Sequence, residues 1–382
     1  MTFQVASPIN PRGGSLAHGA GVTEKKLSMT ARNSPLKYIK KLIPTPVKGV
    51  LKTLLGKSPG KESVDPKQEL RRQISNNPES AELYYQLGKE YFNSHNFFTS
   101  TALFRTALTF EKKNLNQKII LALAKSYQNL GLFDLALHHF NEIKDYFKEE
   151  AAAGLNSCLD QGNKIKANNW ALTYLGYGKY QRFKVIIDSI KSFARPGLKI
   201  MDMGGGNGEF SLFVPQHHYA LVEPLITGIG TPIPFKEKYF DIAVCADVIE
   251  HIPKNRRESS ILEIMRLARK RVYLTAPFGK MSRESETLFF KITKNRWTGE
   301  HLSHEFSTLE EIENFLKNQG VQYKVSSLSF LPTHLSISLL NNYYLKDNKP
   351  LFEEFNHFFN SHYSDLNIKE PSYGHLFEII LS

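Results

Sequence analysis

The residues best suited to chemistry lie in one glycine-rich turn. Gly204, Gly206 and Gly208 occupy alternate positions shortly after Asp202, and the apolar run Leu198–Met201 precedes them. A run of this kind followed by glycines predicts a strand, a tight turn and the start of a helix. Because glycine accepts positive φ and has no Cβ, the backbone here can approach a ligand closely. The turn is therefore a candidate nucleotide-binding loop, although a plain tight turn has the same letters.

A carboxylate downstream of this turn supplies a second candidate group. Glu223 ends the short apolar run Tyr219–Val222, which predicts a second strand. A carboxylate at the tip of such a strand can accept hydrogen bonds from both hydroxyls of a ribose. The dinucleotide fingerprint Gly-x-Gly-x-x-Gly needs a glycine where this chain has Glu209, so that fingerprint does not fit.

Three titratable residues follow the next predicted strand, Tyr239–Ala246. Asp247, Glu250 and His251 are spaced i, i+3 and i+4, so a helix would place them on one face. Neutral imidazole can act as a general base near pH 7, which makes His251 the candidate base and Glu250 its candidate partner. The same three residues could instead hold a divalent cation. We expect a base or a local structural role, and no metal.

In chain order these motifs resemble the class I S-adenosylmethionine-dependent methyltransferases, with Tyr239–Ala246 as the fourth strand and Arg271–Phe278 as the fifth. The resemblance runs from about Leu198 to Ser382. It implies a doubly wound, Rossmann-like α/β sheet that ends in an antiparallel strand pair at about 321–330 and 375–381. It also implies S-adenosyl-L-methionine as the cofactor. The residues implied to frame or contact it are Asp202, Gly204, Gly205, Gly206, Gly208, Glu223, Cys245, Ala246 and Asp247.

The chain departs from the family pattern at one point. Gly228–Thr231 stands where many relatives carry an aspartate that contacts the adenine amine. Thr231 or backbone groups could take that role. The insertion after the fifth strand usually forms a lid on the acceptor side, and here it contains Trp297, His301, His304 and Glu305.

A helical repeat precedes the predicted sheet. The set Leu87, Tyr91 and Phe104 recurs as Leu123, Tyr127 and Phe140, each at an offset of 36 residues. That period is close to the one of tetratricopeptide repeats, about 34 residues. Residues 79–148 therefore resemble two such repeats, with capping helices at about 66–75 and 149–161. The groove of the repeats could bind a protein partner or pack on the neighbouring domain. We expect a chain starting near Asn168 to keep the sheet and its glycine turn.

Charge is concentrated at the amino-terminal end. Residues 1–62 contain eleven Lys or Arg and two Glu, a net of +9, while the whole chain carries +12. We expect a disordered basic arm over 1–65, helical repeats over 66–165 and the α/β domain with lead-in helices over 166–382. Residues 36–57 alternate lysines with apolar residues, so they could contact an anionic membrane. A short packed helix or a solubilising tail fits equally, and we expect no nucleic-acid partner because the rest of the chain is nearly balanced.

Composition sets the remaining expectations. With 41% hydrophobic residues the chain can bury a sizeable core, and its two cysteines show no metal-binding or redox spacing. No secretory segment follows Met1, so we expect a cytoplasmic protein that the arm could hold at a membrane surface. The function we expect is methyl transfer from S-adenosyl-L-methionine to a small-molecule, glycan or lipid-linked acceptor. The alternatives are a protein methyltransferase that recruits its substrate through the repeats and a non-catalytic adaptor with a vestigial cofactor domain.

Overall fold

The computed structural model describes residues 65–112, 115–161, 170–223, 232–365 and 368–381. Val64–Ser382 form one compact unit. The expected basic arm, the possible membrane-contacting segment 36–57 and Gly228–Thr231 lie outside the described residues. Among the described residues, no helix combines the length and the apolar character needed to cross a membrane.

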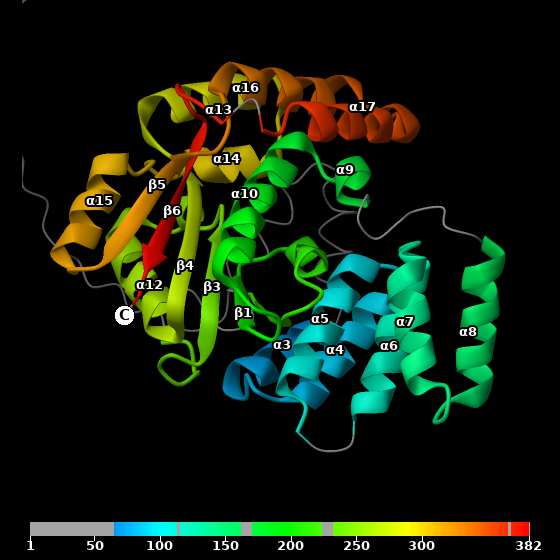
Figure 1. Cartoon of the computed structure of the whole chain (residues 1–382). Coiled ribbons are helices and arrows are strands. Elements are labelled where there is room, and N and C mark those ends of the chain that lie inside the picture. The colour runs from blue at the N-terminus through cyan, green and yellow to red at the C-terminus, as the bar shows by residue number, and fades with distance from the viewer. Residues whose placement is uncertain (1–64, 113–114, 162–169, 224–231, 366–367, 382) are drawn as a thin grey trace, which may run out of the picture. The chain divides into compact units, whose positions relative to one another are not determined.

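The amino-terminal part of the described chain consists of helices connected by short turns (Figure 1). Asp65, Ser80 and Asn96 begin three of them, each accepting a hydrogen bond from a free backbone N–H of the first turn. The helices are α3 (Pro66–Asn76), α4 (Ala81–Asn93), α5 (Phe97–Phe110), α6 (Asn116–Asn129), α7 (Phe133–Ile143) and α8 (Lys148–Gln161).

The 36-residue repeat of the sequence is also present in the backbone. The turn after α4 has His95 at φ 59°, and the turn after α6 has Gly131 at φ 75°, again 36 residues apart. The N–H groups of Asn96 and Leu132 donate to the carbonyls of Tyr91 and Tyr127 at 2.9 Å in both turns. The pairs α4–α5 and α6–α7 are therefore two copies of one helical hairpin, with α3 and α8 at the ends. Their identification as tetratricopeptide repeats stays a prediction.

The rest of the chain forms an α/β layer around one six-stranded sheet in the order β2-β1-β3-β4-β6-β5. The first four strands are parallel, and β6 is antiparallel to both of its neighbours. The expected closing strand pair is therefore present. The strands are β1 (Lys199–Met203), β2 (His218–Val222), β3 (Phe240–Ala246), β4 (Ala268–Pro277), β5 (Gln322–Ser327) and β6 (Gly374–Ile380).

The expected fourth and fifth strands are β3 and β4, and the described residues between β2 and β3 form no strand. As a result β2 lies at the edge of the sheet. Burial separates the central from the outer strands: β3 is buried along almost its whole length, whereas every second residue of β5 is exposed. This difference is typical of a sheet covered on both faces at its centre.

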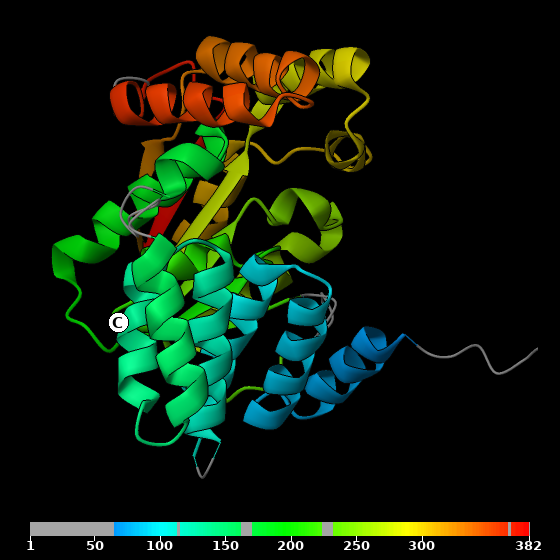
Figure 2. The same ribbon diagram turned by 90° about the vertical axis from the view of Figure 1, so that its right-hand side faces the viewer.

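Helices surround the sheet and gather at the carboxyl ends of its parallel strands, where α13, α16 and α17 lie together (Figures 1 and 2). They are α9 (Trp170–Tyr174), α10 (Tyr177–Phe193), η1 (Glu209–Phe213), η2 (Ile249–His251), α12 (Lys254–Leu267), α13 (Gly279–Thr293), α14 (Arg296–Leu302), α15 (Leu309–Asn318), α16 (Leu331–Leu339), η3 (Leu340–Tyr344) and α17 (Lys349–His362).

The helix start expected after the glycine turn is present as a short 3-10 turn, η1, which ends before Pro215 because proline cannot continue helical hydrogen bonding. One local expectation was wrong: Asp247, Glu250 and His251 do not share a helix face. Asp247 has φ 54° and precedes the short 3-10 turn η2, and Pro253 follows it.

Helix α5 covers the open edge of β2. Thr106 Oγ1 accepts a hydrogen bond from the N–H of Leu221 at 2.9 Å, and Thr109 Oγ1 donates to the carbonyl of Tyr219 at 2.7 Å. These are backbone groups that an edge strand leaves without a strand partner.

Arg105, on the same helix, binds that loop. Its buried guanidinium donates to the carbonyls of Val214 and His217 at 2.8 Å and to the carbonyl of Ser211. We call the amino-terminal helices α3–α8 the helical layer. Three main-chain acceptors in the α/β layer therefore depend on one side chain of this helical layer. The division of residues 66–382 into two domains remains a prediction, and this interface shows how closely any such domains are joined.

We predict that Thr106→Val lowers the free energy of unfolding by about 1–3 kcal/mol, because valine fills the same space but leaves the buried N–H of Leu221 without its acceptor. Urea unfolding followed by circular dichroism measures this. Thr101→Val is the matched control, since Thr101 lies on the same helix with a buried hydroxyl that has no hydrogen-bond partner among the described residues. Equal losses in the two variants would contradict the role given to Thr106.

Candidate functional site

The glycine turn lies at the carboxyl end of β1 in a conformation that requires glycine. Gly204, Gly206 and Gly208 have φ of 69°, 61° and 74°, where side chains with a Cβ are strained. A Cβ on Gly204 would lie 2.7 Å from Val248, and one on Gly208 would lie 2.2 Å from Ala102 of α5. A Cβ on Gly206 would meet nothing within 4 Å. Two glycines therefore allow close packing inside the protein, while Gly206 borders open space that a ligand can enter.

Asp202 lies beneath the turn. It is 2% exposed, and its Oδ2 accepts a hydrogen bond from the hydroxyl of Tyr219 at 2.6 Å. A Cβ on Gly205 would lie 2.2 Å from the same carboxylate oxygen, so the carboxyl supports the turn directly. Burial raises the pKa of Asp202 to about 7, and the hydrogen bond from Tyr219 opposes that rise. The position matches the bracing role that the resemblance implied.

Glu223 lies at the end of β2 and reaches back to the turn. Its Oε1 accepts a hydrogen bond from the N–H of Gly206 at 2.7 Å. Burial raises the pKa of Glu223 to about 7, while the hydrogen bond from Gly206 and the charge of Arg71 favour the ionised form. The carboxylate and the amide that the sequence assigned to one ligand are thus in contact in the folded chain.

A cavity of about 200 Å³ adjoins this pair. Gly206, Asn207 and Glu223 form one side, and the helical layer forms the other. The helical residues include Arg71 of α3, Tyr91 of α4 and Thr99 of α5. Sequence reasoning missed them because they precede the turn by more than 100 residues and carry no motif of their own. Their polar side chains at the repeat surface were the only available signal.

The end of β3 presents a different set of groups. The side chain of Cys245 is fully buried in the sheet, so only its backbone can face a ligand, whereas Ala246 and Asp247 are partly exposed. Asp247 is held from two sides: its Oδ1 accepts from the hydroxyl of Thr275 at 2.8 Å, and its Oδ2 forms an ion pair with Arg182. Arg182 belongs to α10, a helix in which no site residue was predicted.

Glu250 is buried away from solvent. It is 2% exposed, and neither carboxylate oxygen has a hydrogen-bond partner among the described residues. Burial, reinforced by the negative charge of Asp247, raises its pKa well above the usual range. The surroundings favour the neutral form of this carboxyl, and it makes no hydrogen bond to His251.

His251 is instead oriented by a chain of hydrogen bonds from the insertion after β4. Its Nε2 lies 3.1 Å from Nε2 of His301, and Nδ1 of His301 lies 2.9 Å from the buried carboxylate of Glu286. The hydroxyl of Tyr373 donates to the same carboxylate. When Nδ1 of His301 donates to Glu286, its Nε2 is an acceptor, and the Nε2–H of His251 points to it. The Nδ1 atom of His251 then keeps a lone pair that can take a proton.

The lid residues proposed from the sequence divide between two places. His301 contacts His251 as described, and the Trp297 ring stands edge-on to His251 at 6.3 Å. Glu305 forms an ion pair with Lys254 at 3.5 Å instead. Burial and the neighbouring His301 lower the pKa of His251. The imidazole is therefore neutral at pH 7.

Two cavities of about 220 and 240 Å³ adjoin this chain. Asp247 and Arg182 line the first, Glu286 and His301 line the second, and the two share His334, Ser338, Asn342 and Tyr373. The His334 ring stacks on Tyr373 with centroids 3.7 Å apart, and burial lowers its pKa to about 4. This is a region with room for a second molecule beside the end of β3.

The same region also contains possible metal ligands. One ligand atom from each of Glu250, His251 and His301 lies within 4.8 Å of the others. A carboxylate and two imidazoles suit several divalent ions. From the sequence we expected no metal here, and a chelator distinguishes a metal-free base from a metal-bound arrangement.

The comparisons with known proteins found similarity in structure alone. No protein-family model and no curated protein matches the sequence. A magnesium protoporphyrin IX methyltransferase from Synechocystis PCC 6803, solved with bound S-adenosylhomocysteine, is 14% identical, with 54% of this chain and 84% of that chain covered and a TM-score of 0.34. A possible histamine N-methyltransferase from Thermotoga maritima is 15% identical, with 54% and 93% covered and a TM-score of 0.33.

For a third solved structure, the match covers a smaller share of that protein's chain. Phosphoethanolamine N-methyltransferase 2 from Haemonchus contortus, in complex with S-adenosylhomocysteine, is 14% identical, with 56% of each chain covered and a TM-score of 0.34. These structural neighbours are S-adenosylmethionine-dependent methyltransferases with varied acceptors. The assignment of function to this chain rests on its own site geometry.

We predict that Asp202→Asn changes how stability depends on pH. Because the pKa of Asp202 rises from its ordinary value of 3.8 to about 7 on folding, the folded state favours the protonated form. Its contribution to stability is complete below about pH 4 and is lost as pH rises through 7. The loss for wild type relative to Asp202→Asn should be on the order of 3–4 kcal/mol across this interval. Parallel curves from urea titrations at several pH values would contradict the buried-carboxyl assignment.

Proposed function

We propose that this chain is an S-adenosylmethionine-dependent methyltransferase that acts on a small-molecule, glycan or lipid-linked acceptor. The observation that carries the proposal is the contact between Glu223 and the N–H of Gly206 beside open space at the carboxyl edge of the sheet. A nucleoside needs a carboxylate for its ribose and a close backbone for the rest of the molecule, and both occur at this point. The residues present therefore fit this cofactor.

Each residue of the site has a task that its surroundings support. Glu223 would accept hydrogen bonds from the ribose, Gly206 would allow close approach, and Asp202 keeps the turn in shape. Asp247, fixed by Thr275 and Arg182, would present its backbone to the ligand. When bound, S-adenosyl-L-methionine supplies a methyl group already activated for transfer. What remains for the protein is to align the acceptor and to remove its proton.

The acceptor side is defined by the two cavities that share His334 and Tyr373. Nδ1 of His251 would take a proton from an acceptor hydroxyl or hold one in place. Trp297 lines the larger cavity and is 64% exposed, so its ring can lie on a sugar or an apolar chain at the cavity mouth. This supports a glycan or lipid-linked acceptor within the proposed range.

The helical layer takes part in this proposal as a wall of the site. Arg71, Tyr91 and Thr99 line the cavity at Glu223, and α5 packs on Gly208. Removal of this layer would uncover the edge of β2 and the turn together. The expectation that a chain starting near Asn168 keeps an intact turn therefore does not agree with the contacts. Recruitment of a substrate protein by the repeats remains the alternative. It would require the groove formed by those helices that do not line this cavity.

We predict that Glu223→Ala weakens binding of S-adenosyl-L-methionine about 10- to 150-fold, because removing a charged acceptor costs about 1.5–3 kcal/mol. Isothermal titration calorimetry on the full chain measures this. Glu237→Ala is the control, since Glu237 is exposed and lies outside the cavity residues at the turn. If wild type and Glu223→Ala bind with equal affinity, the cofactor assignment is wrong.

We predict that His251→Ala lowers methyl transfer at least about 100-fold once an acceptor is known, as expected for loss of a general base. Because its pKa is lowered, the acidic limb of the wild-type rate profile should fall below the ordinary histidine value. His357→Ala, which changes an exposed histidine of α17, is the control.

Treatment with a chelator distinguishes two roles for Glu250, His251 and His301: a base that acts without metal, and a metal site. A base acting without metal predicts full activity after treatment with a chelator. Activity lost to the chelator and restored by magnesium would show that Glu250, His251 and His301 hold an ion. Normal turnover of His251→Ala with and without chelator would remove both chemical roles.

A further inference from the structure

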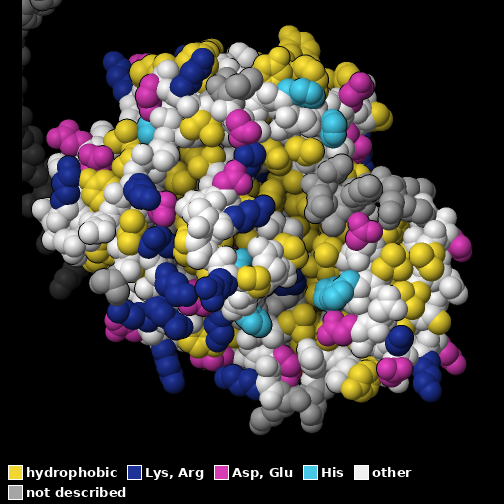
Figure 3. Space-filling model, viewed as in Figure 1, with side chains coloured by type: hydrophobic (Ala, Val, Ile, Leu, Met, Phe, Trp, Pro, Cys, Tyr) yellow, Lys and Arg dark blue, Asp and Glu magenta, His cyan; other side chains and the backbone are white. Residues whose placement is uncertain are grey.

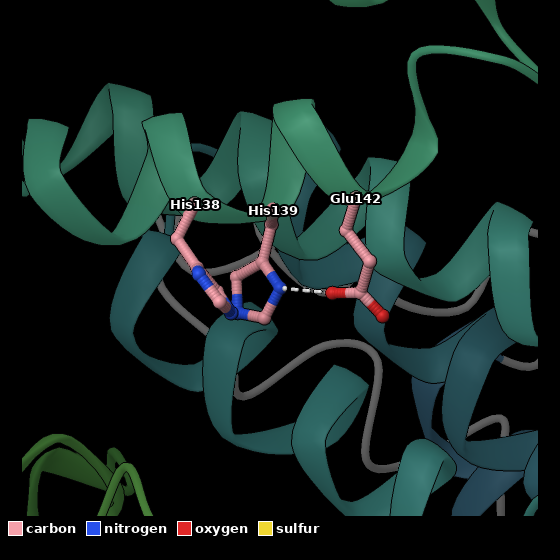
Figure 4. Close-up of side chains that lie close together, drawn as sticks. All are labelled: His138, His139 and Glu142. Atoms are coloured by element: carbon pink, nitrogen blue, oxygen red, sulfur yellow. Dashed lines mark hydrogen bonds and ion pairs between the residues drawn. The ribbon is translucent and has the colours of Figure 1, made fainter.

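A second cluster of metal-ligating side chains lies on α7, and the proposed function does not use it. His138, His139 and Glu142 offer two imidazoles and a carboxylate, with one ligand atom of each lying within 4.8 Å of the others. All three leave the helix on the same side, and His139 lies between the other two (Figure 4). His138 and His139 line a cavity different from the one at Glu223.

Two of the three groups already have the spacing of ligands on one ion. Nδ1 of His139 lies 3.2 Å from Oε2 of Glu142. Ligands about 2.1 Å from a tetrahedral zinc ion lie about 3.4 Å from one another. The third group, His138, is exposed, and its ring centroid is 5.1 Å from that of His139. Rotation of an exposed ring on the surface of a helix is enough to bring its nitrogen to the same point.

The central ligand is held in place by packing. The His139 ring lies parallel to the ring of Tyr127, with an angle of 7° and a centroid distance of 5.6 Å. Tyr127 is 2% exposed and belongs to the core between α6 and α7. A ligand whose ring plane is fixed by a buried neighbour loses little freedom when it binds an ion.

The surroundings leave room for an ion and a fourth ligand. His138 and His139 line a cavity of about 390 Å³ together with His217 and His218. Figure 3 shows histidine side chains gathered over α6 and α7 on this face. His217 is committed elsewhere, since its Nδ1 accepts from the N–H of Leu198. His218 is exposed, so His218 or a water can complete a tetrahedral set.

One fixed positive charge, Arg105, acts electrostatically on His139. Arg105 also lines the cavity, but its guanidinium nitrogens donate to main-chain carbonyls of the α/β layer. Glu142 supplies a negative charge at the cluster itself. Two imidazoles and a carboxylate are the ligand set that borderline ions such as Zn²⁺ accept.

We propose that His138, His139 and Glu142 form a binding site for a transition-metal ion of the Zn²⁺ type at the mouth of the groove between α7 and the start of β2. An ion held there links side chains that are one helical turn apart on α7, and it lies at the open side of the groove. Binding to the folded chain also stabilises it in proportion to the free ion.

Calorimetric titration of the metal-free full chain with Zn²⁺ tests the site. We expect one equivalent to bind, and His138→Ala and Glu142→Gln each to weaken that equivalent at least tenfold. Both residues are exposed, so neither change should affect folding. His357→Ala, an exposed histidine on α17, is the matched control and should bind like wild type. A visible spectrum of tetrahedral Co²⁺ that disappears in His138→Ala would support the same conclusion by a second method.

The variant Glu250→Gln tests the other possible metal site, which consists of Glu250, His251 and His301. If Glu250→Gln loses the Zn²⁺ equivalent while His138→Ala and Glu142→Gln retain it, the ion belongs to the other cluster and the proposal is overturned. It is equally overturned if the wild-type chain shows no saturable binding, or if all the variants bind alike. Methyltransferase activity does not enter the readout, so failure here leaves the proposed function untouched.

Discussion

The free edge of β2 is the constraint on which the rest of the structure depends. A strand at the edge of a sheet presents N–H and C=O groups that need partners once they are buried. Here the partners are side chains of α5: Thr106 and Thr109 on the strand, and Arg105 on the loop before it. Each such buried group would cost about 1–3 kcal/mol without a partner. The helical layer is therefore fixed to the sheet by directed hydrogen bonds as well as by apolar contact.

This interface also shapes the ligand site. Because Gly208 packs on Ala102, the third glycine of the turn provides space for a helix of the repeat, while Gly206 provides space for a ligand. The same helices place Arg71 and Tyr91 beside Glu223. The helical layer carries no cofactor motif in the sequence, yet it forms part of the wall of the cavity at Glu223. Changes in the helical layer can reach the glycine turn through direct packing.

On the other side of the turn, several buried titratable groups lie close together. Asp202 and Glu250 are held towards their neutral forms by burial. Glu286 orients His301, which in turn orients His251. Tyr373 precedes β6, and His301 belongs to α14. This chain of hydrogen bonds therefore joins the insertion after β4 to the closing strand pair. In such a site a hydrogen bond is electrostatically stronger than in water, which suits alignment of an acceptor.

The sequence by itself determined the local elements of this protein. Apolar runs ending in Gly204 and Glu223 predicted two strands whose tips meet, and the structure joins these tips by one hydrogen bond. The 36-residue offset predicted two helical hairpins with flanking helices, and α3–α8 have those bounds within a few residues. Such features depend on hydrophobic periodicity and on glycine conformations, which are properties of short segments.

Only the tertiary structure decided which distant groups act together. No spacing in the sequence pairs Arg182 with Asp247, Glu286 with His301, or Arg71 with the cavity at Glu223. The helical face expected for Asp247, Glu250 and His251 was lost because Asp247 adopts a left-handed conformation and Pro253 ends the segment. Cys245 does lie near the end of β3, but β3 is buried on both faces, so its side chain belongs to the core. These outcomes depend on long-range packing, in which each backbone group and buried charge finds a partner that sequence separation does not encode.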